Sequence, residues 1–143
     1  MTVKGSLLRP MVAAFLTAGV SAFGEVFKDG ETVCFLGDSI TARGSTQTVI
    51  ADYYLTRFPD RTVRFANAGR SGDSAGGALG RLQEDVIDKK PTAVTLMLGM
   101  NDVGRGNYVA APSENQKAAQ KRALDGYQAN MEKIVARIRA EAH

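Results

Sequence analysis

The fold of this chain is decided by residues 33–40, which have the sequence VCFLGDSI. A short apolar run leads into a glycine, an acidic residue and a serine, and polar residues follow. This pattern predicts a buried β-strand over residues 32–36 that stops abruptly. Ser39 then lies just past the carboxyl end of the strand, where open α/β sheets place their reactive groups. We expect Ser39 to be either a nucleophile or the cap of the next helix.

Two further strand patterns also end in polar residues and glycines. Residues 62–66 alternate polar and apolar side chains and precede a glycine-rich stretch over residues 67–80. Residues 93–98 are almost continuously apolar, which predicts a strand buried on both faces, and GMND follows them.

Helical patterns lie between and after these strands. Apolar residues recur at helical spacing over residues 49–58, and a second helix is predicted through Leu82, Val86 and Ile87. Ser113 and Gln116 form a capping-box pattern before a final amphipathic helix that carries Leu124 on its apolar face. We expect residues 41–45 and 103–112 to be loops.

The alternation of strands and helices predicts an α/β fold, with a parallel sheet and helices packed on it. The carboxyl ends of parallel strands lie at one edge of the sheet. We therefore expect the polar clusters around Ser39, Gly69 and Asn101 to converge on one crevice.

Length and charge bound the possible functions. The 143 residues suit one domain, and the formal net charge is +3. Lys4 and Arg9 lie among the first 24 residues, which hold no acidic residue, so the remaining chain has a net charge of +1. The composition therefore gives little support to nucleic-acid binding. The single cysteine, Cys34, lies within the apolar strand and is expected to be a core residue.

The N-terminal residues resemble a secretory signal. Lys4 and Arg9 precede an apolar run over residues 11–20, and small residues follow at positions 21–24. The run is too short for a transmembrane helix. We expect residues 1–24 to be a signal peptide and residues 25–143 to form a secreted or periplasmic domain without stable membrane insertion; a buried N-terminal helix is the alternative.

The three strand ends carry groups suited to nucleophilic catalysis. A serine nucleophile needs donors for the oxyanion, and the backbone amides of Ser39 and Gly69 and the side-chain NH2 of Asn101 are candidates. Each has a structural alternative, such as a cap or a tight turn, but their joint placement favours a site. Other residues at the strand ends are assigned supporting roles: Gly37, Asp38, Asn67, Gly72 and Asp102.

The chain resembles the SGNH hydrolases of the GDSL esterase/lipase superfamily. Gly37-Asp38-Ser39-Ile40 matches the first block of the family, and residues 67–73 (NAGRSGD) resemble the second. Residues 99–102 (GMND) resemble the third. The resemblance implies a flavodoxin-like three-layer α/β/α sandwich and ester hydrolysis through an acyl-serine, without a metal or cofactor. It assigns the nucleophile to Ser39 and the oxyanion donors to Ser39, Gly69 and Asn101.

The fourth family block, Asp-x-x-His, has no match. The only histidine is His143, and Ala140 stands where the aspartate is expected. The sequence therefore looks truncated before the last strands of the family fold, and we expect an exposed edge on the third strand, low stability and little activity.

The substrate is expected to be a small or polysaccharide-linked ester, as for an acetylesterase or a lysophospholipase. Two alternatives are a catalytically inactive fragment or binding relic, and a nucleotide-binding α/β domain that uses the glycine-rich stretch. The sequence leaves the oligomeric state open.

Overall fold

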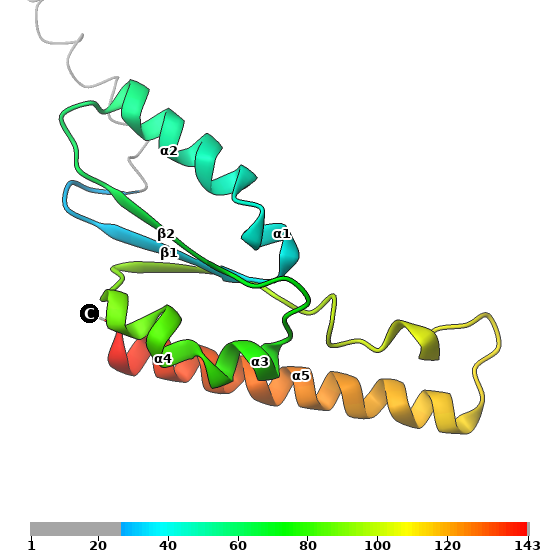
Figure 1. Ribbon diagram of the computed structural model, residues 1–143. Helices are drawn as coiled ribbons and strands as arrows, with labels where there is room; N and C mark the ends of the chain where they lie inside the picture. Colours follow the sequence, from blue (N-terminus) through cyan, green and yellow to red (C-terminus); the bar gives the residue numbers. More distant parts are fainter. Residues whose placement is uncertain (1–26, 143) are drawn as a thin grey trace, which may run out of the picture.

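The computed structural model describes residues 27–142, so the predicted signal peptide lies outside the described residues. Three strands in this range form one parallel sheet in the order β2-β1-β3. They are β1 (Thr32–Gly37), β2 (Arg64–Gly69) and β3 (Ala93–Met97). Helices cover both faces of the sheet and give three layers (Figure 1). The predicted α/β fold with a parallel sheet is confirmed.

One face of the sheet is covered by α1 (Ser39–Ala42) and α2 (Ser45–Arg57). The ring of Tyr54 on α2 packs against Phe65 on β2, with 5.8 Å between the ring centroids. The prediction of a loop over residues 41–45 is wrong in part, because α1 includes its first two positions and α2 begins at Ser45. Gly44, with a φ of 78°, then turns the chain into α2.

The other face is covered by α3 (Ala75–Gly80), α4 (Leu82–Asp85), the 3₁₀ turn η1 (Ile87–Lys89) and α5 (Glu114–Glu141). The single helix predicted through residues 82–87 is therefore divided, and helical structure begins earlier, inside the glycine-rich stretch. The Ser74 hydroxyl caps α3 by accepting a hydrogen bond from the amide of Gly77. This cap stabilises a helix start that the glycines disfavour.

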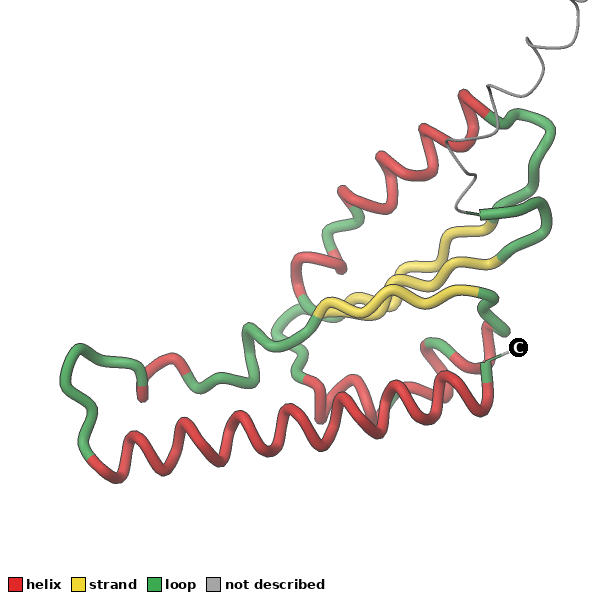
Figure 2. Tube along the Cα trace, turned by 180° about the vertical axis from the view of Figure 1, so that it is seen from behind, coloured by secondary structure: helices red, strands yellow, loops and turns green. Residues whose placement is uncertain are grey.

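The long helix α5 begins at the predicted capping box of Ser113 and Gln116. Ile134, in its second half, is fully buried against the sheet. The first half runs past the end of the sheet together with the loop that holds η2 (Arg105–Asn107) (Figure 2). Leu124 lies in this projecting half and is 61% exposed, so its expected place on a buried face is wrong.

The central strand β1 is buried on both faces, whereas β3 is an edge strand. Cys34 and Leu36 are fully buried beneath α3–α5, which confirms the core role of the cysteine. Thr95 and Met97 of β3 are exposed beside a groove of about 310 Å³ between α2 and β3. The expectation that β3 is buried on both faces is therefore wrong. The predicted free edge is confirmed, since within residues 27–142 β3 pairs only with β1.

None of the helices in residues 27–142 is long and apolar enough to cross a bilayer.

Candidate active site

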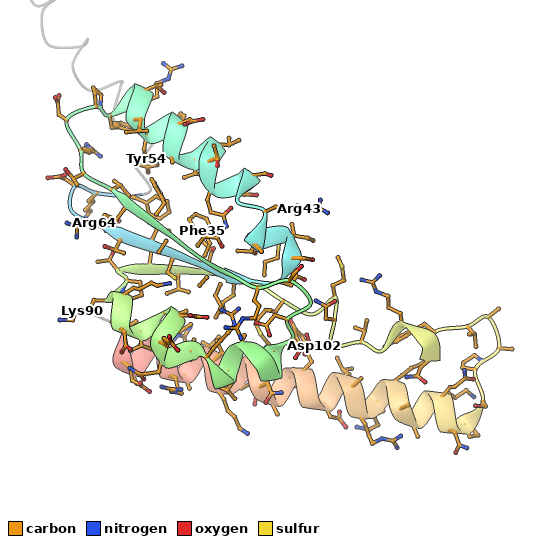
Figure 3. All side chains as sticks on the ribbon, in the orientation of Figure 1. Phe35, Arg43, Tyr54, Arg64, Lys90 and Asp102 are labelled. Carbon is orange, nitrogen blue, oxygen red and sulfur yellow. The ribbon has the colours of Figure 1, made fainter. Side chains whose placement is uncertain are left out.

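The carboxyl ends of the three strands lie at one edge of the sheet, as the sequence predicts. Gly37 at the end of β1 pairs with Gly69 on one side and with Met97 on the other. Arg43 and Asp102, in the loops that follow β1 and β3, lie toward this end of the molecule (Figure 3). The candidate residues therefore come from the carboxyl ends of three strands and from the segments that directly follow them.

Ser39 is the first residue of α1 and is half-buried. The cap of α1 is Asp38, whose Oδ1 accepts a hydrogen bond of 2.9 Å from the amide of Ile40 and whose side chain is buried. No hydrogen bond joins the Ser39 hydroxyl to another group within residues 27–142. The alternative in which Ser39 caps the helix is therefore not supported, and its hydroxyl has no partner in the part of the chain that the structure describes.

Gly37 allows α1 to start directly at the end of β1. A Cβ at this position would overlap the side chain of Thr41 and the carbonyl oxygen of Met97. Only a glycine lets the strand end lie this close to both neighbours. Its predicted supporting role is therefore a matter of close packing.

The amide of Gly69 is already engaged. It donates a hydrogen bond of 2.8 Å to Oδ1 of Asn67, while Nδ2 of Asn67 donates 3.1 Å to the carbonyl oxygen of Thr41. A Cβ on Gly69 would overlap the backbone nitrogen of Ala42. In this geometry Gly69 packs β2 against α1, Asn67 joins the two elements, and the Gly69 amide that the resemblance assigns to the oxyanion is bonded to Asn67.

Gly72, unlike Gly69, has a backbone amide without a hydrogen-bond partner among the described residues. It lies in a turn closed by a hydrogen bond of 3.2 Å from the Asp73 amide to the Arg70 carbonyl, and its φ is 76°. Glycine adopts this left-handed conformation without strain. Gly72 is exposed, and among the described residues its amide has no hydrogen-bond partner.

Asn101 and Asp102 attach the loop after β3 to the loop after β2. Nδ2 of Asn101 donates a hydrogen bond of 2.7 Å to the main-chain carbonyl of Asp73. Oδ1 of Asp102 accepts 2.9 Å from the amide of Ala75. One N–H of the exposed Asn101 carboxamide therefore fixes the side chain, and the second has no hydrogen-bond partner among the described residues.

Arg81 is a residue of this region that the sequence analysis missed. Its side chain is only 7% exposed, and Nε and Nη1 bond to the carboxylates of Asp73 at 2.8 Å and Asp85 at 2.6 Å. Burial alone lowers the pKa of the guanidinium, but the hydrogen bonds to Asp85 and Asp73 outweigh it and raise the pKa. Arg81 is the N-cap residue of α4, and its spacing of four residues from Asp85 could have predicted that one ion pair, but not the contacts with Asp73 and Gly37.

The glycine-rich stretch is not arranged as a phosphate cradle. Three amides at the start of α3, those of Ser74, Ala75 and Gly77, already donate to Asp73, Asp102 and Ser74 side-chain oxygens. Two of these acceptors are carboxylates, which would repel a phosphate. This arrangement argues against the nucleotide-binding alternative. Residues 27–142 also contain no group of three acidic, histidine or cysteine side chains that could hold a metal.

Comparison with known protein families and curated proteins identifies related sequences. Residues 35–143 match the model of the GDSL-like Lipase/Acylhydrolase family. The chain is 30% identical to an acetylxylan esterase of Geobacillus stearothermophilus over 121 residues, 74% of this chain and 53% of that protein. It is 35% identical to esterase TesA of Pseudomonas aeruginosa over 101 residues, 67% of this chain and 50% of that protein. The chain thus spans about half the length of these curated relatives.

Solved structures of hydrolases are also similar to this chain. A gut microbial diltiazem-metabolizing enzyme superposes with a TM-score of 0.69 at 35% identity, over 78% of this chain and 25% of that chain. The acetylxylan esterase of Geobacillus stearothermophilus superposes with a TM-score of 0.65 at 26% identity, over 80% and 57% of the two chains. The three-layer arrangement described above is therefore shared with hydrolases of this family.

Proposed function

The chain belongs to the GDSL-like lipase/acylhydrolase family, and we propose that it hydrolyses carboxylic esters through an acyl intermediate on Ser39. The observation that carries the proposal is the hydrogen bond of 2.7 Å from Nδ2 of Asn101 to the carbonyl of Asp73. It joins the loops after β2 and β3 beside the end of β1, where the Ser39 hydroxyl is available.

In the first step, Oγ of Ser39 attacks the ester carbonyl carbon and its proton passes to a base. The carbonyl oxygen becomes an oxyanion, which the amides of Ser39 and Gly72 and the second N–H of Asn101 stabilise. The alcohol leaves with a proton, and water then hydrolyses the acyl-serine. We assign the second backbone donor to Gly72 instead of Gly69, because the Gly69 amide is bonded to Asn67.

The base is the part of this mechanism that the described residues do not supply. Catalytic mutants of the Geobacillus stearothermophilus relative carry alanine in place of a serine, an aspartate or a histidine. Residues 27–142 of this chain contain no histidine. The described residues thus supply the nucleophile and the oxyanion donors, and the proposed mechanism needs an imidazole in addition to them.

Added imidazole provides a direct test of the mechanism. Hydrolysis of p-nitrophenyl acetate is measured with increasing imidazole for the wild-type chain and for Ser39→Ala, whose turnover gives the background. We expect turnover above that background to rise with imidazole, together with an acetyl group on the Ser39 peptide in mass spectrometry. Equal turnover of the two chains, both folded by circular dichroism, contradicts the proposal and supports the binding-relic alternative.

For the substrate, we propose a short acyl ester, with an acetylated carbohydrate as the natural class. The support comes from the acetylxylan esterase relative and from Tyr108, an aromatic side chain that is 54% exposed in the loop after β3. Aromatic rings offer an apolar face on which sugars can lie. Faster turnover of p-nitrophenyl octanoate than of the acetate would favour a lipase-like substrate instead.

We also propose that the protein is exported, on the basis of the N-terminal pattern in residues 1–24. Expression in a bacterial host tests this: the secreted or periplasmic form is expected to begin near Glu25. An uncleaved chain that stays in the cytoplasm would contradict it.

A further inference from the structure

Arg81 joins segments that are far apart in the sequence. Its guanidinium bonds to the carboxylates of Asp73 and Asp85, and Nη2 also donates 3.3 Å to the carbonyl oxygen of Gly37. Gly37 precedes the Asp38–Ser39 pair at the end of β1, and Asp73 follows Gly72 in the loop after β2. One buried cation therefore contacts the end of β1 and the loop after β2, two of the three segments that meet at the candidate active site.

The third segment, the loop after β3, is reached through Asp73. The side chain of Asp73 is 6% exposed, and its carboxylate accepts a hydrogen bond from Arg81. The main-chain carbonyl of the same residue accepts a hydrogen bond from Nδ2 of Asn101. Gly77 makes room for this carboxylate, since a Cβ there would overlap Oδ1 of Asp73. The position of the Asn101 carboxamide is thus tied to where Arg81 holds Asp73.

Stability alone gives a poor reason for this buried pair. Desolvation of two charges costs much of what their attraction returns, and apolar residues of similar volume often serve a core equally well. Unlike apolar residues, a planar guanidinium fixes the relative positions of its partners, because its donors bond to several acceptors in one geometry. Arg81 has three acceptors in three segments, an arrangement that defines the position of each relative to the others.

We propose that Arg81 is a positioning residue which, through Asp73, holds the Asn101 carboxamide where it can donate to the oxyanion. This inference rests on the proposed function, in which Asn101 is an oxyanion donor. Arg81 itself does not touch the substrate. It acts through a chain of contacts from Arg81 to Asp73 and from Asp73 to Asn101.

The first test is spectroscopic and needs no turnover. In ¹⁵N-labelled protein the Asn101 side-chain signal is assigned by its loss in Asn101→Ala. Arg81→Lys keeps the positive charge but lacks the planar guanidinium with its several donors. We therefore expect the chemical shift of the hydrogen-bonded Asn101 Nδ2 proton to move toward that of a free amide. We also expect this proton to exchange with solvent about tenfold faster, as for loss of one neutral hydrogen bond. Asp73→Asn, which also weakens the pair, is expected to shift the signal in the same direction and serves if Arg81→Lys does not fold.

The matched control is Asp85→Asn. It removes the other ion pair of Arg81, which is as short at 2.6 Å, but Asp85 has no hydrogen bond to Asn101 or Asp73. We expect it to lower the melting temperature and leave the Asn101 signal in place. An unchanged Asn101 signal in a folded Arg81→Lys or Asp73→Asn chain overturns the inference, and so does an equal shift in Asp85→Asn.

The second test is kinetic and uses the imidazole-dependent, Ser39-dependent hydrolysis. Arg81→Lys is expected to lower kcat about 10²-fold with little change in KM, the size of effect that follows from a misplaced catalytic group. In an Asn101→Ala background the same substitution is expected to have almost no further effect on kcat, because the group it positions is gone. If the losses in kcat from the two substitutions are additive, the inference is contradicted, whereas the proposal of ester hydrolysis stands. If no Ser39-dependent turnover is found, the proposed function is contradicted, and the spectroscopic test still decides whether Arg81 positions Asn101.

Discussion

The amide of Gly69 donates a hydrogen bond of 2.8 Å to Oδ1 of Asn67. Gly69 therefore differs in its role from Gly72, which lies only three residues further along the chain. Gly69 faces the backbone of α1 and has no room for a side chain, whereas Gly72 has open space around its Cα and an unpaired amide among the described residues. The first glycine is required by packing and the second by its backbone conformation.

Alanine substitutions are expected to tell these two roles apart. Gly69→Ala places a Cβ on the backbone nitrogen of Ala42, which cannot move without shifting α1, so we expect a loss of about 3 kcal/mol in the free energy of unfolding. Gly72→Ala meets no atom but strains a residue with a φ of 76°, at a cost of about 1 kcal/mol. Urea unfolding followed by circular dichroism measures both values; equal losses would contradict the assignment.

Cys34 is expected to be unreactive in the folded chain. Burial raises the pKa of its thiol, and the side chain has no exposed surface, so the reactive thiolate is both scarce and inaccessible. We expect Ellman's reagent at pH 8 to react with Cys34 only as fast as the chain unfolds. Since Cys34 is the only cysteine, the signal has one source, and the urea-unfolded chain provides the control. Immediate reaction of the native protein would show that β1 is accessible.

The parts of the fold that could be predicted from the sequence are those set by local patterns. The apolar run of β1 and the capping box of Ser113 and Gln116 are contiguous in the chain, and both lie where the sequence placed them. The convergence of the strand ends followed from parallel topology alone. These features depend on neighbours within a few residues or on a general rule about sheets.

The parts that were missed depend on residues far apart in the sequence. The start of α3 in a glycine-rich stretch depends on Asp102, 27 residues away, which bonds to the amide of Ala75. The choice between Gly69 and Gly72 depends on where the Asn67 side chain points. Arg81 resembles any surface arginine until Asp73 and the Gly37 carbonyl are placed around it. Local propensity carries no information about such partners.

Two apolar residues of α5 are expected to differ sharply in their contribution to stability. Ile134 is fully buried in the core cluster, so Ile134→Ala leaves a cavity and is expected to lower the free energy of unfolding by about 3 kcal/mol. Leu124 lies in the projecting half of the same helix, and Leu124→Ala is expected to change it by less than about 0.5 kcal/mol. Both substitutions introduce the same residue into one helix, which makes them a matched pair for urea unfolding. Similar losses would mean that the projecting half of α5 is packed against something.

The free edge of β3 is expected to cause self-association. Its outer backbone groups pair with no strand within residues 27–142, and the exposed Thr95 and Met97 border the groove beside α2. An unprotected edge with apolar neighbours is a template for pairing with another chain, and a charge on it opposes such pairing. We expect the apparent mass in light scattering to rise with concentration for the wild type and to stay near that of a monomer for Thr95→Lys. Val49→Lys, which adds the same charge at an exposed position of α2, is the control and should associate like the wild type. A wild-type chain that remains monomeric at high concentration would mean that the edge of β3 is covered in solution.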